Sequence, residues 1–430
     1  MRIEVFPAAS GDCLLITSSD DKRMLADAGL PDAYDTFIAA PLAALRHASK
    51  AIDVVYVSHI DRDHIGGVLR LLDDEVKWRV FDHMQSNGMP FKQPAAPRPP
   101  EVRAIWHNAF LEDIARSEDI KLDGALAASA NALAGLNAAG LGTSEAARAA
   151  ERAEMLALSV GDAIEVNWRV GDDQLGIPLN PDVNGAMMVA RPKDPIALGS
   201  MQITVLGPTK VELKELRKQW IAWLKGNETY LRKLRESHRK DIDDLRNGLS
   251  PTELARRIQQ NTKGIEGDVT PPNLASLVLL VEGDGRRILM TGDAGDESLM
   301  KYLTAANLIG DDKRLDVDVL KVPHHGAHNS YSTVFVEKIR ARHYIYCGDG
   351  EHHNPEPEVV KGYIRAVEAA PLAGGESTTF WFNCSTARCE PKHSKLWQTI
   401  EGFFQGGGVA STTKARFLAR NADRHVVDIS

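Results

Sequence analysis

Two histidines and two aspartates occur within one short segment, SHIDRDHIGG, as His59, Asp61, Asp63 and His64. Imidazole nitrogens and carboxylate oxygens at this density are the donors that bind divalent cations such as Zn²⁺ or Mn²⁺. On an extended stretch alternate residues share one side, so the first three would face one way, with the fourth at the turn that follows. The alternative is a loop whose Asp and His side chains only satisfy backbone groups, but four such residues together favour a metal site.

The residues around this group predict a strand, a polar loop and a helix. The apolar run VVYVS at 54–58 stops at His59, and the segment HIGGVLRLL has apolar residues at helical spacing, with Gly66 and Gly67 opening the helix. The polar group would then lie at the carboxyl end of a buried strand, which is where α/β folds place their chemistry.

The rest of the chain predicts an α/β core interrupted by helical segments. Short apolar runs with turn signals occur within residues 1–70, and strand-like runs return at 201–209 and from 273 onward. Two blocks with helical character interrupt them. We therefore predict a core formed by 1–108, 166–209 and 266–371, helical insertions at 109–165 and 210–265, and a C-terminal extension of the core at 372–430.

Composition limits the kinds of partner and compartment. The net charge of −8 gives no general attraction to polyanions, which counts against a long nucleic-acid footprint. Four cysteines in 430 residues indicate a reducing compartment without a disulfide framework. Neither a secretory signal nor an apolar run long enough to span a bilayer is evident, so we expect a cytoplasmic protein without membrane contact.

The segment HIDRDHIGG resembles the second motif of the metallo-β-lactamase superfamily, in the variant where Asp replaces the second His. That variant is similar to the hydrolase domain of ComEC-type DNA-uptake proteins. Further similar segments follow in the family's order: GDCLLI at 11–16, LADAG with Asp27, RRILMTGDA with Asp293, DVLKVPHHG with His324 and His325, and GEHHNPEPEV at 350–359. The resemblance implies the αββα sandwich of this superfamily, interrupted by helical insertions.

The resemblance also implies two unequal cation sites, holding one or two divalent metal ions, Zn or Mn. One site would be complete, with the ligands Asp63, His64, Asp293 and His325. The other would take His59, Asp61 and the shared Asp293, but the family's third-motif histidine, expected just before Ser276, has no counterpart in PPNLA. Asn273, His107 and His353 are the candidates for completing it or for contacting substrate.

Five residues near these motifs have expected roles of other kinds. Asp63 is expected to orient the attacking water as well as bind metal, His324 to donate a proton or contact substrate, and Lys321 to hold an anionic substrate. In the superfamily's usual VPGHG turn, a glycine stands where this chain has His324. Asp12 and Asp27 are expected to accept the free N–H of ligating histidines, and turn capping is the alternative.

These observations predict a metal-dependent hydrolase that acts through a metal-activated water. A phosphodiesterase or nuclease is favoured, with a nucleic acid or nucleotide as substrate, since oxygen-rich ligands suit hard cations that act on phosphates. One alternative is a hydrolase of a small ester, lactone or amide. Another is a regulatory or interaction subunit of a larger complex with a partly degenerate metal site, which would meet a protein partner or a second copy through the helical insertions.

Overall fold

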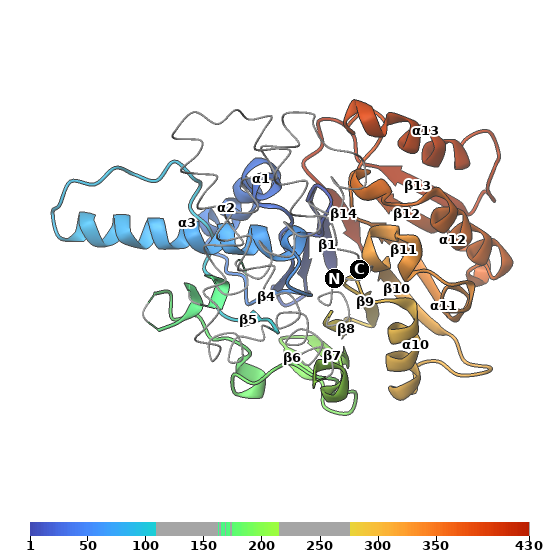
Figure 1. Cartoon of the computed structure of the whole chain (residues 1–430), viewed down its shortest axis with the longest axis horizontal. Helices are drawn as coiled ribbons and strands as arrows, with labels where there is room; N and C mark the ends of the chain where they lie inside the picture. Colours follow the sequence, from blue (N-terminus) through green and yellow to red (C-terminus); the bar gives the residue numbers. More distant parts are fainter. Residues whose placement is uncertain (109–161, 163–164, 168, 173, 215–275, 430) are drawn as a thin grey trace, which may run out of the picture.

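The computed structural model describes residues 1–108, 162, 165–167, 169–172, 174–214 and 276–429 (Figure 1). Within these ranges the strands form two sheets of six and eight strands. The six-stranded sheet has the order β14-β1-β2-β3-β4-β5, with β1 (Arg2–Val5), β2 (Leu14–Thr17), β3 (Arg23–Ala26), β4 (Val54–Tyr56), β5 (Ile105–Trp106) and β14 (His425–Asp428). The eight-stranded sheet has the order β13-β12-β11-β10-β9-β8-β7-β6, with β6 (Ile196–Leu198), β7 (Met201–Gly207), β8 (Val278–Gly283), β9 (Arg286–Met290), β10 (Leu315–Lys321), β11 (Ile339–Tyr346), β12 (Thr378–Phe382) and β13 (Thr413–Phe417).

Both sheets mix antiparallel and parallel pairing. In the first sheet, β14, β1, β2 and β3 pair antiparallel, and β3, β4 and β5 pair parallel. In the second sheet, β6 to β9 pair antiparallel, and β9 to β13 pair parallel. The carboxyl ends of β4, β9 and β10 therefore each deliver a loop that can carry functional side chains.

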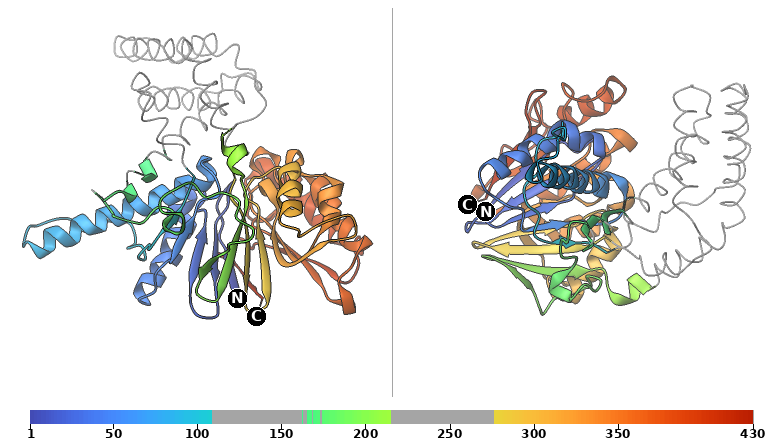
Figure 2. Two further views of the ribbon diagram at one scale, coloured as in Figure 1. Left: turned by 90° about the horizontal axis from the view of Figure 1, so that it is seen from below. Right: turned by 90° about the vertical axis from the view of Figure 1, so that its left-hand side faces the viewer.

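Helices flank the two sheets on their outer sides (Figures 1 and 2). The first group is α1 (Pro31–Ala33), the π-helical turn η1 (Tyr34–Ile38), α2 (Ala39–His47) and α3 (Arg62–Ser86). The second group is α10 (Asp296–Ala305), α11 (Thr333–Lys338), α12 (Pro357–Ala369) and α13 (Ser394–Phe403). Short 3₁₀ turns are η2 (Pro181–Val183), η4 (Pro323–Gly326), η5 (His328–Ser330), η6 (Glu351–His353), η7 (Ala373–Gly375) and η8 (Pro391–His393).

Three apolar clusters bind these layers together. The central cluster joins the facing sides of the two sheets, with Ile3 and Met24 from the first sheet and Val281 and Val319 from the second. A second cluster packs the first sheet against α1 to α3, and a third packs the second sheet against α10 to α13. Since strand side chains alternate between faces, each sheet contributes to the central cluster and to one outer cluster.

The predicted α/β class is confirmed by two mixed sheets with helices, an arrangement consistent with a metallo-β-lactamase-type fold. The strand-like runs at 54–58 and 201–209 form β4 and β7. Residues 372–430 supply β12, β13 and β14, so the C-terminal stretch adds strands to both sheets. No helix in the described part of the chain is long and apolar enough to cross a membrane.

One expected boundary is wrong. Helix α3 begins at Arg62, before the glycine pair, so Asp63 and His64 belong to its first turn instead of the preceding loop. The helical insertions predicted at 109–165 and 210–265, and any partner surface on them, lie almost entirely outside the described residues, as does Asn273.

Candidate metal centre

The segment after β4 places its polar side chains where a strand turns into a helix. His59 follows β4 by three residues and is buried, while Asp61 occupies the N-cap position of α3. An Asp at an N-cap usually accepts a hydrogen bond from a backbone N–H of the first turn. The Asp61 carboxylate makes no such bond, and its Oδ2 lies 3.5 Å from His59 Nε2. The carboxylate is therefore directed at the site.

Two glycines let the first turn of α3 approach the loops below it. A Cβ at Gly67 would come within 2.0 Å of the Ala28 carbonyl oxygen, and one at Gly11 within 1.6 Å of the Asp63 carbonyl oxygen. Any side chain at either position would force the backbones apart. The glycines of the HIDRDHIGG and GDCLLI segments thus bring Asp63 and His64 close to the β1–β2 loop and the end of β3.

The second sheet contributes three residues from two neighbouring strand ends. Asp293 follows β9, and His324 and His325 form the turn η4 after β10. Both histidines have left-handed backbone angles, with φ of 48° at His324 and 54° at His325. Such angles are uncommon for residues other than glycine, and they cluster at functional sites.

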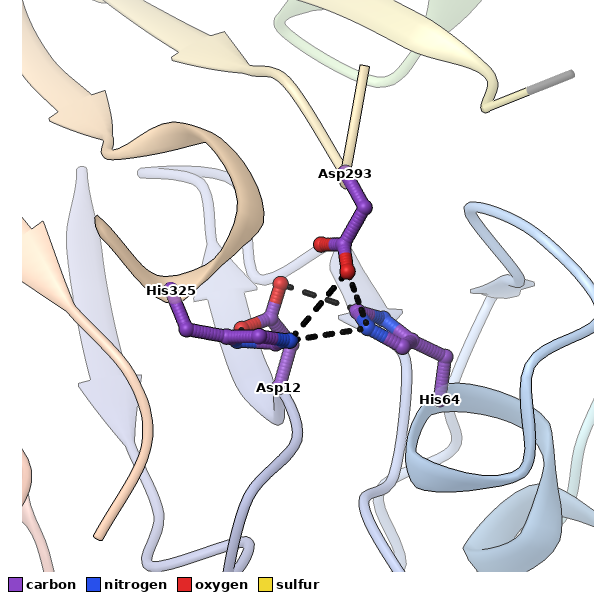
Figure 3. A group of neighbouring side chains, drawn as sticks. All are labelled: Asp12, His64, Asp293 and His325. Carbon is purple, nitrogen blue, oxygen red and sulfur yellow. Dashed lines mark hydrogen bonds and ion pairs between the residues drawn. The ribbon is translucent and has the colours of Figure 1, made fainter. Parts of the chain in front are cut away.

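Four imidazole Nε2 atoms converge on one oxygen, Asp293 Oδ2. They lie 3.2 Å (His325), 3.4 Å (His64), 3.6 Å (His324) and 3.8 Å (His59) from it. Figure 3 shows His64 and His325 meeting Asp293, with the two Nε2 atoms 3.3 Å apart. Asp63 completes this half, with its two oxygens 3.6 Å from His325 Nε2 and 3.9 Å from His64 Nε2.

The opposite nitrogen of each ring, Nδ1, is held by an oxygen of a neighbouring side chain. His64 Nδ1 donates to Asp27 Oδ2 at 2.9 Å, and His325 Nδ1 donates to Asp12 Oδ1 at 3.0 Å. Ser58 Oγ lies 3.0 Å from His59 Nδ1, and Ser330 Oγ lies 3.1 Å from His324 Nδ1. Fixing Nδ1 in this way orients the ring and leaves Nε2 to bind a cation.

Asp12 acts on the site through other residues. It is close enough to His64, Asp293 and His325 to be counted among metal-binding candidates, since one donor atom from each lies within 4.8 Å of the others. However, its Oδ1 accepts from His325 Nδ1, and its Oδ2 pairs with Lys321 Nζ. Asp12 therefore faces the side of the His325 ring that points away from the convergence point.

Lys321 lies beneath the site with a fully buried side chain. Its ammonium pairs with Asp12, donates to the Gly292 carbonyl oxygen at 3.0 Å and lies 3.4 Å from Asp293 Oδ1. With no surface exposed, Lys321 is placed to hold these two carboxylates. By contrast, Asp61, Asp63 and His324 have side chains that are 20%, 15% and 19% exposed, so a substrate would approach from their side.

The pKa values in the site are shifted because charged groups of opposite sign are buried beside one another. Burial would raise the pKa of Asp293, but the charges of His325, His64, His324 and Lys321 outweigh it and hold the pKa well below its usual range. Burial would lower the pKa of His325, yet Asp293 and Asp12 raise it to about 9. The pKa of His64 is likewise raised against the effect of burial, chiefly by Asp293 and Asp27.

The residues present fit a divalent cation. His59 Nε2 is buried and has no hydrogen-bond partner among the described residues, although it faces two carboxylates. A buried lone pair without a partner is unfavourable, and a cation among these nitrogen and oxygen donors would satisfy it. Imidazole with carboxylate suits Zn²⁺ and Mn²⁺ alike, so the donor set does not select between them.

The remaining candidates lie elsewhere or have other surroundings. His107 is buried at the end of β5, neither of its ring nitrogens has a hydrogen-bond partner among the described residues, and its pKa is lowered to about 4 by burial alone. His353 is exposed in η6. The sequence alone assigns no role to Ser58 or to Ser330. The one local signal is that Ser58 precedes His59 directly.

The raised histidine pKa values predict how the metal-free protein responds to pH. A raised pKa stabilises the fold below the ordinary value of 6.5, and this contribution is lost as pH rises through about 9 for His325. The melting temperature of metal-free protein should therefore fall between about pH 7 and pH 9. With Mn²⁺ present the fall should be smaller, because the cation replaces the protons as partner of Asp293. Calorimetry across this range tests the prediction, and parallel curves with and without Mn²⁺ would contradict it.

Residues 7–76 match the family model of the Metallo-beta-lactamase superfamily. This stretch includes Asp12, Asp27 and the segment from His59 to His64, and it covers well under half of the chain. Members of this superfamily are generally metal-dependent hydrolases, and the buried cluster of Asp and His side chains is a candidate metal site of the corresponding kind. The chain matches no curated protein.

Proposed function

We propose that this protein is a metal-dependent phosphodiesterase, in which a water molecule attacks phosphorus at the edge shared by the two sheets. The observation that carries the proposal is the convergence of four imidazole Nε2 atoms on Asp293 Oδ2, with Asp61 and Asp63 beside them. In this proposal the two sheets, with helices on their outer sides, form the αββα sandwich of the superfamily. Residues 109–165 and 210–265 would be helical insertions in that sandwich.

Each residue of the site would have a role that follows from its position. His64 and His325, with Asp63 and Asp293, would hold a divalent cation, which supplies Lewis acidity and makes water a better nucleophile near neutral pH. Asp63 is partly exposed beside this group and can accept a proton from the attacking water. Asp27, Asp12 and Lys321 would keep the rings and the shared carboxylate in place.

Phosphodiesters suit the donor set better than lactones do. Asp61, Asp63 and Asp293 provide carboxylate oxygens that suit hard cations as well as Zn²⁺, and hard cations commonly act on phosphates. The resemblance of HIDRDHIGG to proteins that process DNA points the same way. A nucleotide or a short nucleic-acid end agrees better with the net charge of −8 than a long duplex does.

The test compares two substrate classes on one preparation. Metal-free protein is reconstituted with Mn²⁺ or Zn²⁺ and assayed with bis-p-nitrophenyl phosphate and with a panel of lactones, each in parallel with excess chelator. We expect hydrolysis of the phosphodiester with at least one metal, falling by about 100-fold or more on chelation. Lactone hydrolysis without phosphodiester hydrolysis would replace this proposal with that of a lactonase. No hydrolysis of either the phosphodiester or the lactones, with metal bound, would contradict a hydrolytic role.

A further inference from the structure

His324 lies beside the half of the site that lacks a ligand. His59 Nε2 is 3.5 Å from Asp61 Oδ2 and 3.8 Å from Asp293 Oδ2. His324 Nε2 is 3.6 Å from that same Asp293 oxygen. The shared oxygen Asp293 Oδ2 therefore brings His324 together with His59, whose other carboxylate neighbour is Asp61.

We propose that His324 is the missing ligand of a second cation site, formed by His59, Asp61, Asp293 and His324. The inference rests on the proposed function, since it assumes a protein that binds divalent metal. It assigns to the turn after β10 the position that the superfamily fills with its third-motif histidine. The two cations would share Asp293, with His64 and His325 on one side and His59 and His324 on the other.

The contacts of two serines are compatible, in both rings, with the tautomer that a metal ligand needs. Ser58 Oγ donates its only hydrogen to Asp27 Oδ2 at 2.7 Å, so it accepts from His59 Nδ1. Ser330 Oγ lies 3.1 Å from His324 Nδ1 and can accept from it while donating to Asn329 Oδ1 at 3.4 Å. A neutral ring that carries its hydrogen on Nδ1 has a free lone pair on Nε2, which in both histidines faces Asp293.

The backbone at His324 supports a functional reason for its side chain. Its φ of 48° is one that glycine adopts without strain, and the superfamily's usual VPGHG turn has glycine at this position. An imidazole here is strained by its own backbone, and such strain persists where the side chain has a use. Ligation of a cation beside His59 is the use that the contacts of His324 favour.

Other described histidines fit the second site less well. His107 is buried, and its pKa is shifted by burial alone, so the site carboxylates do not influence it. His353 is exposed in η6, and His328 is exposed in η5. Among the described residues, His324 is therefore the histidine that joins His59 at Asp293 without already belonging to the His64 and His325 pair.

The experiment counts bound metal in two variants. His324→Gly removes the imidazole and leaves a residue suited to the backbone angle, so the fold is retained. His328→Ala removes an exposed histidine of the same loop and serves as the matched control. Metal-free full-length protein is titrated with Mn²⁺ while free Mn²⁺ is followed by electron paramagnetic resonance, and Zn²⁺ content is measured after dialysis.

We expect two equivalents of Mn²⁺ in the unchanged protein and in His328→Ala, and one tight equivalent in His324→Gly. In His324→Gly the second equivalent of Mn²⁺ should bind more than about 100-fold more weakly than in the unchanged protein. That loss exceeds the loss expected from removing a residue that only supports a ligand through a hydrogen bond. Two tight equivalents in His324→Gly would overturn the assignment, as would one equivalent in the unchanged protein, or loss of both on substitution. No binding by the unchanged protein would instead remove the proposed function itself.

Discussion

Replacing Asp293 with Asn should abolish tight metal binding and lower phosphodiester hydrolysis on the order of a thousand-fold. All four imidazoles point their Nε2 atoms at Asp293 Oδ2, so this oxygen is the one donor common to both halves of the site. Asn has nearly the same shape but no charge, and the centre loses several kcal/mol of attraction for a divalent cation. The side-chain position is otherwise preserved, since the Asp293 backbone N–H still donates to Ser276 Oγ.

Metal content and hydrolysis should fall together in this variant. Both are measured on the same preparation, and circular dichroism checks that the fold is intact. Glu297→Gln is the matched control, because it removes an exposed carboxylate in the first turn of α10, four residues further on. That control should retain both properties. Full metal content with lost activity would show that Asp293 acts on substrate and not as the shared ligand.

Several strands of both sheets are predictable because their signals are local. Apolar runs bounded by turn residues give β4, β7 and β10 directly. The pairing of β14 with β1 has no such signal, since it joins the two ends of the described chain. Segments so distant in sequence meet because each leaves an unpaired strand edge, which local propensity does not reveal.

The sequence pattern predicts a start of α3 that is too late, and the reason is physical. Two successive glycines weaken a helix, so Gly66 and Gly67 suggest that it begins at or after them. In the folded chain they lie inside the helix, because a side chain at either position would collide with Pro31 or Ala28. Tertiary contact outweighs propensity here, and it carries Asp63 and His64 into the first helical turn.

The candidate site is predictable to the extent that its residues sit in short motifs. HIDRDHIGG and MTGDA contain His59, His64 and Asp293, and their chemistry predicts a cation site. The grouping of His324 with His59 depends on tertiary structure, because the turn after β10 and the loop after β4 belong to different sheets and meet at Asp293 Oδ2. Likewise, a lysine at a strand end is normally solvated, and only the packing shows Lys321 to be buried between two carboxylates.

Replacing Lys321 with Met should destabilise the metal-free protein by about 3–5 kcal/mol, the usual effect of removing one partner from a buried ion pair. Met fills a similar volume, so the loss reflects the charge. Asp12 Oδ2 and Asp293 Oδ1 would both lose the ammonium that faces them, and the Gly292 carbonyl oxygen would lose its donor. Urea unfolding of metal-free protein measures the change. Lys301→Met, which breaks an exposed pair with Glu212, should cost about 1 kcal/mol or less.

The pH dependence separates this electrostatic effect from lost packing. In the unchanged protein, burial raises the pKa of Asp12, but Lys321 and His325 outweigh it and hold the pKa below its usual range. That contribution to stability is present above the ordinary pKa of 3.8 and is lost as pH falls. In Lys321→Met the ammonium no longer opposes the effect of burial, so the pKa of Asp12 rises and the charged form of Asp12 is disfavoured. The difference in stability between the two proteins should therefore grow between about pH 4 and pH 7.

A second substitution identifies the carboxylate responsible. Asp12→Asn in the Lys321→Met background removes the charge left without its partner, so the double variant should be no less stable than Lys321→Met alone and should lose much of the pH dependence. If lost packing were the cause, the losses of stability caused by Lys321→Met and by Asp12→Asn would add. The difference in stability between the unchanged protein and Lys321→Met would then stay constant with pH. Mn²⁺ stabilises every variant that binds it, so the informative quantity is the gain in stability relative to that of the unchanged protein. Lys321→Met should gain more than the unchanged protein, because a cation near Asp293 restores a positive charge beside that carboxylate, whereas with a packing defect alone the two gains would be equal.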